Sequence, residues 1–255
     1  MFGTCRTVLI LSLLAASPAT GQWLVATIPV PDSTASDLDE VNCTAYNPRT
    51  GITYFGGNAV LALDGGTNCR VALIPTGATV TALCCETTAN KVYAVVTGES
   101  TQVAVVDGET HAILTRLQLD SVFGAPAVNP ASREVYFANP AANTVTVIDA
   151  DGDSIITAIQ VGDRPVAICC NTTNGKVYSA NRESDDVTVV DGTSRKVVAT
   201  ITDVTEPGLL CFNPVDNHVY CANGDEAITV IDGHRDVVLS VIEIDMDCRA
   251  LFHHP

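Results

Sequence analysis

Three aspartates alternate along one short segment, a pattern that can bind a hard cation. Asp149, Asp151 and Asp153 enclose Gly152, and carboxylates at alternate positions open the calcium loop of EF-hand proteins. The second half of that motif is missing, because the sixth position holds Ser154 in place of glycine and the twelfth holds Gln160 in place of a bidentate glutamate. The three aspartates are therefore only a weak calcium candidate.

Ten cysteines raise the question of disulfides or a metal centre. The adjacent pairs Cys84-Cys85 and Cys169-Cys170 cannot clamp one metal on a strand, where neighbouring side chains point to opposite faces. In the aligned repeats described below, cysteine alternates with alanine, valine and aromatic residues at two positions, which is typical of buried thiols. Cys211 and Cys221 lie on consecutive expected strands, so a local disulfide between them stays open as an alternative.

Motifs of common active sites are absent from the sequence. It has no Gly-x-Ser-x-Gly elbow, no phosphate-binding glycine loop and no Cys-x-x-Cys pair. The histidines follow no spacing typical of metal ligands; they are His111, His218, His234, His253 and His254. We therefore expect no cofactor and a function other than catalysis.

The elements that position these residues are set by an internal repeat of roughly 42 residues. A tyrosine recurs every 39 to 43 residues, and an aspartate that ends an apolar run recurs every 41 to 43. An asparagine lies seven residues before most of the tyrosines, with Glu86 in its place in the second copy. The series are Tyr54, Tyr93, Tyr136, Tyr178 and Tyr220; Asp64, Asp107, Asp149, Asp191 and Asp232; and Asn47, Asn129, Asn171 and Asn213. The five full copies are residues 37–77, 78–120, 121–163, 164–206 and 207–247.

Each copy is expected to form four short strands. In the fourth copy the apolar runs are Val166–Cys170, Lys176–Ala180, Val187–Val190 and Lys196–Ile201, separated by turn-forming residues. The first three runs are apolar at nearly every position, which is typical of a sheet covered on both faces. A ring of four-stranded antiparallel sheets packed face to face meets this demand, so the sequence predicts an all-β propeller.

Repetition also indicates what the recurrent residues do. An aspartate that every repeat needs is expected to accept backbone N–H groups in the following turn, not to take part in catalysis. The recurrent tyrosine is expected to pack between neighbouring sheets with its hydroxyl tethered.

Two segments carry a resemblance to a known family. VYFANPAANTVTVIDADGDSIITAIQVGDRP and VYSANRESDDVTVVDGTSRKVVATITDVTEP resemble the YVTN family of β-propeller repeats, which includes YncE-like extracytoplasmic proteins. The likeness covers residues 23–255 and is strongest in copies three to five. The second copy departs from it, with Val96 where Asn139, Asn181 and Asn223 stand, and the first is shortened around Gly56-Gly57-Asn58. The resemblance implies a propeller scaffold, and members are mostly regarded as binding or surface proteins.

Composition narrows the location and the partners. Residues 1–21 have the layout of a secretory signal peptide, with Arg6, an apolar run from Val8 to Ala16 and a small-residue stretch. That run is about half the length of a membrane span, so we expect a secreted, periplasmic or cell-surface protein without one. The formal net charge of -16 makes nucleic acid an unfavourable partner. We expect a protein, peptide or extracellular polymer as ligand.

One slot in the repeat varies in chemistry while its neighbours recur. It lies at the entry to each first strand and holds Thr79, Val122, Arg164, Glu206 and, in a partial sixth copy, Asp247. A site grafted on a repeated scaffold is expected to vary in this way, so these residues are our ligand-binding candidates. The alternative is that these positions lie in solvent-exposed turns and vary because nothing constrains them. The alternative for the protein is an enzyme, a lactonase-like hydrolase or quinone-type oxidoreductase, with its site in the central channel.

Both ends of the propeller domain, residues 22–255, hold part of a repeat. WLVATIPV at residues 23–30 matches a fourth strand, and CRALFHHP at residues 248–255 matches a first strand. A closed ring needs a complete last blade, so we expect either an open ring or a longer natural chain truncated at its C-terminal end.

Overall fold

The computed structural model describes residues 38, 40–224, 226–244, 248 and 251, and it is built from β-strands. Twenty strands form five antiparallel sheets of four, in which each strand pairs with the next along the chain. The sheets, called blades, comprise β1 (Cys43–Asn47), β2 (Ile52–Gly56), β3 (Ala59–Asp64) and β4 (Arg70–Pro75); β5 (Thr79–Glu86), β6 (Lys91–Thr97), β7 (Thr101–Asp107) and β8 (Ile113–Leu119); β9 (Phe123–Asn129), β10 (Glu134–Asn139), β11 (Thr144–Asp149) and β12 (Ser154–Gln160); β13 (Pro165–Asn171), β14 (Lys176–Asn181), β15 (Asp186–Asp191) and β16 (Lys196–Ile201); and β17 (Pro207–Asn213), β18 (His218–Asn223), β19 (Ala227–Asp232) and β20 (Val237–Glu243). The described residues form no helix, and hence none able to cross a membrane.

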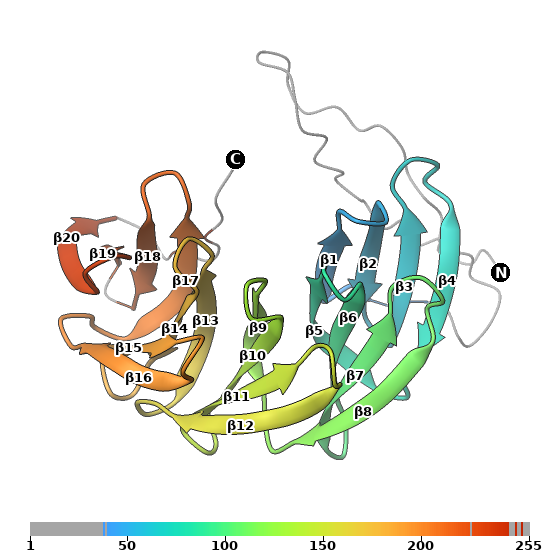
Figure 1. Cartoon of the computed structure of the whole chain (residues 1–255), viewed down its shortest axis with the longest axis horizontal. Coiled ribbons are helices and arrows are strands. Elements are labelled where there is room, and N and C mark those ends of the chain that lie inside the picture. Colours follow the sequence, from blue (N-terminus) through green and yellow to red (C-terminus); the bar gives the residue numbers. More distant parts are fainter. Residues whose placement is uncertain (1–37, 39, 225, 245–247, 249–250, 252–255) are drawn as a thin grey trace, which may run out of the picture.

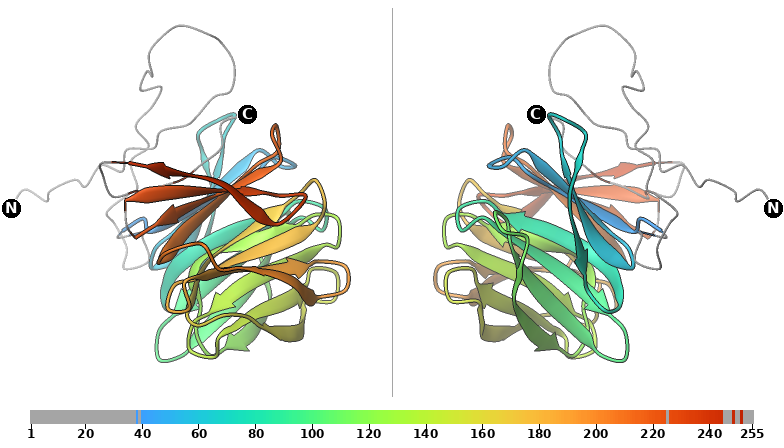
Figure 2. Two further views of the ribbon diagram at one scale, coloured as in Figure 1. Left: turned by 90° about the vertical axis from the view of Figure 1, so that its left-hand side faces the viewer. Right: turned by 90° about the vertical axis from the view of Figure 1, so that its right-hand side faces the viewer.

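The blades follow one another around an arc (Figure 1). The first strand of each blade lies on the inner side of the arc, and the fourth strand lies on its outer side. Figure 2 shows the arc from the side of the fifth blade and from the side of the first. These two blades stand apart across the opening of the arc, and the described residues place no strand between them.

The predicted five-bladed all-β fold is confirmed. Each sheet lies within one of the predicted repeats, and the four strands of the fourth blade begin and end within one residue of the predicted runs. The signal peptide of residues 1–21 and the partial repeats at residues 23–30 and 248–255 lie outside the described residues, except for Cys248 and Leu251. Their roles therefore remain expectations from the sequence.

The core lies between blades and explains why the first three strands are apolar on both faces. One cluster joins Tyr54 and Val60 of the first blade to Val80 and Val92 of the second. Clusters of the same kind join the second blade to the third, the third to the fourth and the fourth to the fifth. Every inner blade is therefore covered on both faces, and burial of β-branched side chains stabilises the stack.

The two terminal blades differ in how their outward faces are covered. On the first blade, Leu38 packs with Phe55 and Leu61 and all three are buried. On the fifth blade, Tyr220 occupies the position of the fully buried tyrosines of the other blades but is only partly buried. The face that carries Tyr220 has no further blade among the described residues to pack against.

Three ion pairs join the second blade to the third, the third to the fourth and the fourth to the fifth. In each pair, one residue begins the second strand of the earlier blade. The other ends the turn between the third and fourth strands of the later blade. In two of them a lysine of the earlier blade binds an aspartate of the later one, whereas in the third the charges are exchanged. The pairs are Lys91–Asp153 at 2.7 Å, Lys176–Asp236 at 2.5 Å and, in reverse, Glu134–Arg195, whose Oε1–Nε distance is 2.8 Å.

Candidate functional site

The two ends of the blades carry different connections between strands. At one end, here called the turn face, lie the turns that join first to second strands and third to fourth strands. At the other, the loop face, lie the turns between second and third strands and the loops that lead from one blade to the next, such as residues 161–164 and 202–206. Entry to the first strands is on the loop face, so Thr79, Val122, Arg164 and Glu206 lie there.

The recurrent aspartates shape the β3–β4-type turns, as predicted. In every blade the Oδ1 atom of this aspartate accepts at least one backbone N–H from the turn that follows. The N–O distances are 2.7 Å for Thr67–Asp64, 2.7 Å for Thr110–Asp107, 3.0 Å for Asp151–Asp149, 2.6 Å for Ser194–Asp191 and 2.8 Å for His234–Asp232. These hydrogen bonds favour the carboxylate and hold the pKa of Asp64, Asp107, Asp191 and Asp232 below its usual value.

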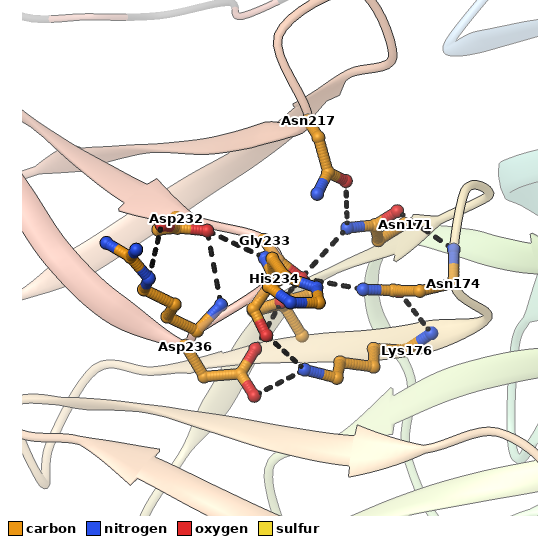
Figure 3. A network of polar contacts seen from close by, with 10 residues as sticks. Asn171, Asn174, Lys176, Asn217, Asp232, Gly233, His234 and Asp236 are labelled. Atoms are coloured by element: carbon orange, nitrogen blue, oxygen red, sulfur yellow. Dashed lines mark hydrogen bonds and ion pairs between the residues drawn. The ribbon is translucent and has the colours of Figure 1, made fainter.

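The recurrent asparagines tie neighbouring blades together. Figure 3 shows Asn171 of the fourth blade, whose Nδ2 donates to Asn217 Oδ1 of the fifth at 2.8 Å. Its Oδ1 meanwhile accepts the backbone N–H of Thr173 at 3.0 Å. Asn47 and Asn129 bond to the next blade in a related way, whereas Asn213 of the last blade turns to its own Asp216. A site on the turn face would thus compete with contacts that hold the blades together.

Four of the recurrent tyrosines, Tyr54, Tyr93, Tyr136 and Tyr178, are fully buried between blades, and most hydroxyls of the series are tethered. Tyr54 and Tyr178 donate to the carbonyl oxygens of Gly108 and Gly233, respectively, in the next blade, and Tyr178 also donates to Asp236 at 2.7 Å. Burial is the main cause that raises the pKa of Tyr54 to about 12. Tyr93 is the exception, because its buried hydroxyl finds no hydrogen-bond partner.

The three aspartates of the calcium candidate are directed to separate partners. Asp149 accepts hydrogen bonds within its own turn, Asp151 pairs with Arg133 at 2.8 Å, and Asp153 pairs with Lys91 at 2.7 Å. Among the residues that the structure describes, no three His, Cys, Asp or Glu side chains form a group able to hold a metal ion.

The cysteines behave as core residues and not as disulfide partners. The register of β17 and β18 pairs Cys211 with Tyr220 and Cys221 with Leu210. Directly opposed residues share a face, so Cys211 and Cys221 point to opposite faces of the fifth blade, and the possible disulfide between them does not form. No disulfide joins any of the described cysteines.

Two of the predicted site residues form a charged band on the loop face between the fourth and fifth blades. Arg164 pairs with Glu183 at 2.9 Å, and Glu206 pairs with Arg182 at 3.4 Å. All four side chains are about half exposed. The band also continues through the backbone, because the N–H of Arg182 donates to the carbonyl oxygen of Arg164 at 3.0 Å.

The backbone at Arg164 and Glu206 is held in an unusual conformation. Their φ angles are +54° and +42°, a region that non-glycine residues rarely adopt. Asn143 accepts the N–H of Arg164 at 2.9 Å, and Asp185 accepts the N–H of Glu206 at 2.7 Å. The corner before each first strand is thereby fixed, so that both side chains project from a rigid support.

The other predicted site residues are not brought into this band. Thr79 is exposed at the start of β5, and its neighbour on the same face is Thr81, which bonds to Thr97. Val122 is half-buried and packs against the core between the second and third blades. Asp247 lies outside the described residues.

Few carboxylates reach the inner side of the arc. The first strands of the five blades carry one, Glu86, whose oxygens accept the backbone N–H groups of Thr88 and Ala89. It therefore substitutes for the recurrent asparagine of the turn. The converging carboxylates that would favour a metal-dependent enzyme are not found on the described first strands.

One further charged residue, Asp186 at the start of β15, is not among the residues predicted from the sequence. This side chain lines a cavity of about 260 Å³ between the third and fourth blades, which extends from Gln160 and Asp186, at the loop-face ends of their strands, to Val197, near the turn-face end of β16. The position is uncharged in every other blade, where it holds Ala59, Gln102, Thr144 and Ala227. A comparison of this slot across the repeats was the signal that could have found it.

Comparisons with known proteins support the fold. The chain matches no protein-family model and no curated protein. Its structure is similar to that of U3-55K, with a TM-score of 0.65 and 10% sequence identity. The match covers 80% of this chain and 64% of the U3-55K chain, so this chain spans a little under two thirds of that structure. Five four-stranded blades and this likeness define the chain as a β-propeller.

Proposed function

We propose that this protein is a non-enzymatic binding scaffold that takes a protein, peptide or extracellular polymer on its loop face. The observation that carries the proposal is the contrast between its two ends. On the turn face the same residue types recur and bind one another across blades, whereas on the loop face the side chains vary and several charged groups are exposed. Variable side chains on a rigid, repeated support are typical of a recognition surface.

We also propose that the protein acts outside the cytoplasm and is of the YVTN type. The layout of residues 1–21 supports secretion, and the Tyr-x-x-Asn and Val-Ile-Asp signatures support the family. The net charge of -16 favours partners that carry positive charge.

The test is a double substitution in the charged band, Arg164→Ala with Glu206→Ala, examined with the full chain. Partners captured from the extracellular fraction by crosslinking would be identified first, and their affinity for the variant would then be measured. We expect binding to fall at least tenfold. The melting temperature should stay unchanged, because exposed ion pairs contribute little to stability.

The matched control lies on the opposite face. Arg133 and Asp151 form an ion pair of 2.8 Å with side chains about half exposed, so Arg133→Ala with Asp151→Ala removes the same charges from the turn face. This control should bind as the unmodified protein does. Equal loss of affinity in both double variants, or none in either, would contradict a site on the loop face.

A further inference from the structure

The carboxylate of Asp186 is buried without a cation beside it. The residue is 7% exposed, and among the described residues no lysine or arginine forms an ion pair with it. Two arginines of the loop face, Arg182 and Arg164, bind Glu206 and Glu183 instead. Burial of an uncompensated carboxylate is costly, and the scaffold does not require it, since the other four blades have an uncharged residue there.

Neutral donors orient this carboxylate and leave one of its oxygens available. Oδ1 accepts the Nδ2 hydrogen of Asn181 at 2.6 Å and the hydroxyl hydrogen of Thr188 at 3.4 Å. Asn181 is itself held by Ser179, whose hydroxyl donates to its Oδ1 at 2.9 Å. No described residue donates a hydrogen bond to Oδ2, although Asp186 lines the cavity.

The loop from the third blade leaves space for this carboxylate. A Cβ atom at Gly162 would lie 2.4 Å from Ser184 Oγ and 2.7 Å from both oxygens of Asp186, so the loop needs a glycine where it passes this carboxylate. Beside it, Gln160 has its amide orientation set, because Nε2 donates to the carbonyl oxygen of Asn143 at 2.8 Å. Its Oε1 atom is then an acceptor, and Thr200 adds a hydroxyl to the lining.

We propose that this cavity binds the ammonium group of a lysine side chain presented by a partner protein. This assignment rests on the proposed scaffold function and names the chemistry that the loop face would recognise. An ammonium group has three N–H donors, and Asp186, Gln160 and Thr200 offer three acceptor oxygens. Val161 and Val197, which also line the cavity, provide apolar surface for the aliphatic stem of the lysine.

The geometry favours an ammonium group over two other cations. An arginine fork binds a carboxylate best through both oxygens, and here Oδ1 is already engaged by Asn181 and Thr188. Calcium takes six to eight oxygen ligands, often several carboxylates, whereas Asp186 is the only carboxylate that lines this cavity. A compact point charge with three donors fits the acceptors that remain.

The test uses Nα-acetyl-lysine N-methylamide as the probe, titrated into the full chain and followed by NMR at the Gly162 backbone amide and the Gln160 side-chain amide. We expect saturable shifts at both groups. Asp186→Asn, which keeps the size of the side chain, should weaken binding at least tenfold. Asp151→Asn, which removes one negative charge from an exposed residue of the turn face, should change the affinity by less than twofold.

A second variant guards against loss of folding in the first. Gly162→Ala leaves every charge in place and fills the space before the carboxylate, so it should also weaken binding at least tenfold while the spectrum elsewhere stays native. Equal binding of the Nε-acetylated probe, equal weakening by Asp151→Asn, or calcium chloride that displaces the probe at millimolar concentration would each overturn the proposal. A partner that no longer binds the Arg164/Glu206 double variant but binds the Asp186→Asn protein normally would rule out the lysine site at Asp186. The proposed scaffold function would still stand.

Discussion

Arg195 of the fourth blade binds Glu134 of the third at the position where Lys91 binds Asp153 and Lys176 binds Asp236, with the charges exchanged between the blades. The carboxylate of Glu134 is almost completely buried and also accepts the hydroxyl hydrogen of Tyr136 at 2.6 Å. The ion pair is thus present at all three interfaces, but at this one the positive and negative residues have exchanged blades. At this position the interface requires opposite charges on neighbouring blades. The placement of the charges also helps to specify which blade packs against which.

Exchange of the two charges should therefore be tolerated where removal of one is not. Arg195→Ala should lower the free energy of unfolding by about 3 kcal/mol, because it leaves the buried Glu134 without its partner. Glu134→Lys with Arg195→Asp should recover most of this loss, since it recreates the polarity of the adjacent interfaces. Denaturant unfolding measures both.

The control for this experiment is the exposed pair on the turn face. Arg133→Ala should change the free energy of unfolding by less than about 0.5 kcal/mol. If the exchanged pair is no more stable than Arg195→Ala alone, the polarity at this interface is fixed by other contacts and the argument from complementarity is wrong.

The recurrent tyrosines should differ in their contribution according to the blade they occupy. Tyr178 is fully buried between the fourth and fifth blades, so Tyr178→Ala should cost about 3–5 kcal/mol through the cavity it leaves. Tyr220→Ala, the same substitution on the outward face of the fifth blade, should cost less than about 2 kcal/mol because less surface returns to water. Equal losses in urea unfolding would show that the Tyr220 face is covered in solution.

The fold could be predicted because the information for it is repeated. Any one blade has short apolar runs that are ambiguous alone, but the Tyr and Asp series established the repeat, and the apolar runs of the fourth copy then predicted its strand boundaries to within one residue. The role of the Asp series followed from turn chemistry that acts within a few residues of sequence, and the structure confirms it in all five blades.

Contacts that depend on strand register, or on residues that are distant in sequence, were harder to predict. Cys211 and Cys221 were placed on adjacent strands correctly, yet the register puts them on opposite faces. Asp186 was overlooked because its burial depends on Gly162 of the preceding blade. The variable slot at Arg164 and Glu206 stays a prediction, and only Val122 proved to be partly packed into the core.

Thiol reactivity should follow burial, with one cysteine modified well before the rest. Cys69 is exposed in the β3–β4 turn of the first blade, whereas burial raises the pKa of Cys84 and Cys169 well above its usual value. Since the thiolate is the reactive form, iodoacetamide at pH 8 should label Cys69 first. Peptide mass spectrometry would follow the order, with Cys69→Ser as control. Labelling of Cys169 as fast as Cys69 in the native protein would contradict the packing between blades four and five.

Acid should destabilise the propeller through the aspartate turns. The pKa of Asp107, Asp191 and Asp232 is lowered in the folded protein, chiefly by backbone N–H donors, so the folded state binds protons less readily than the unfolded chain does. Their stabilising effect is complete above the ordinary aspartate pKa of 3.8 and is lost as the pH falls through the lower pKa of the folded state.

Asp191→Asn keeps an oxygen that can accept the Ser194 N–H but does not titrate. The urea midpoint should therefore fall less steeply for Asp191→Asn than for the unmodified protein between about pH 5 and pH 2. Identical slopes for Asp191→Asn and the unmodified protein would show that the turn hydrogen bonds do not discriminate between the two protonation states.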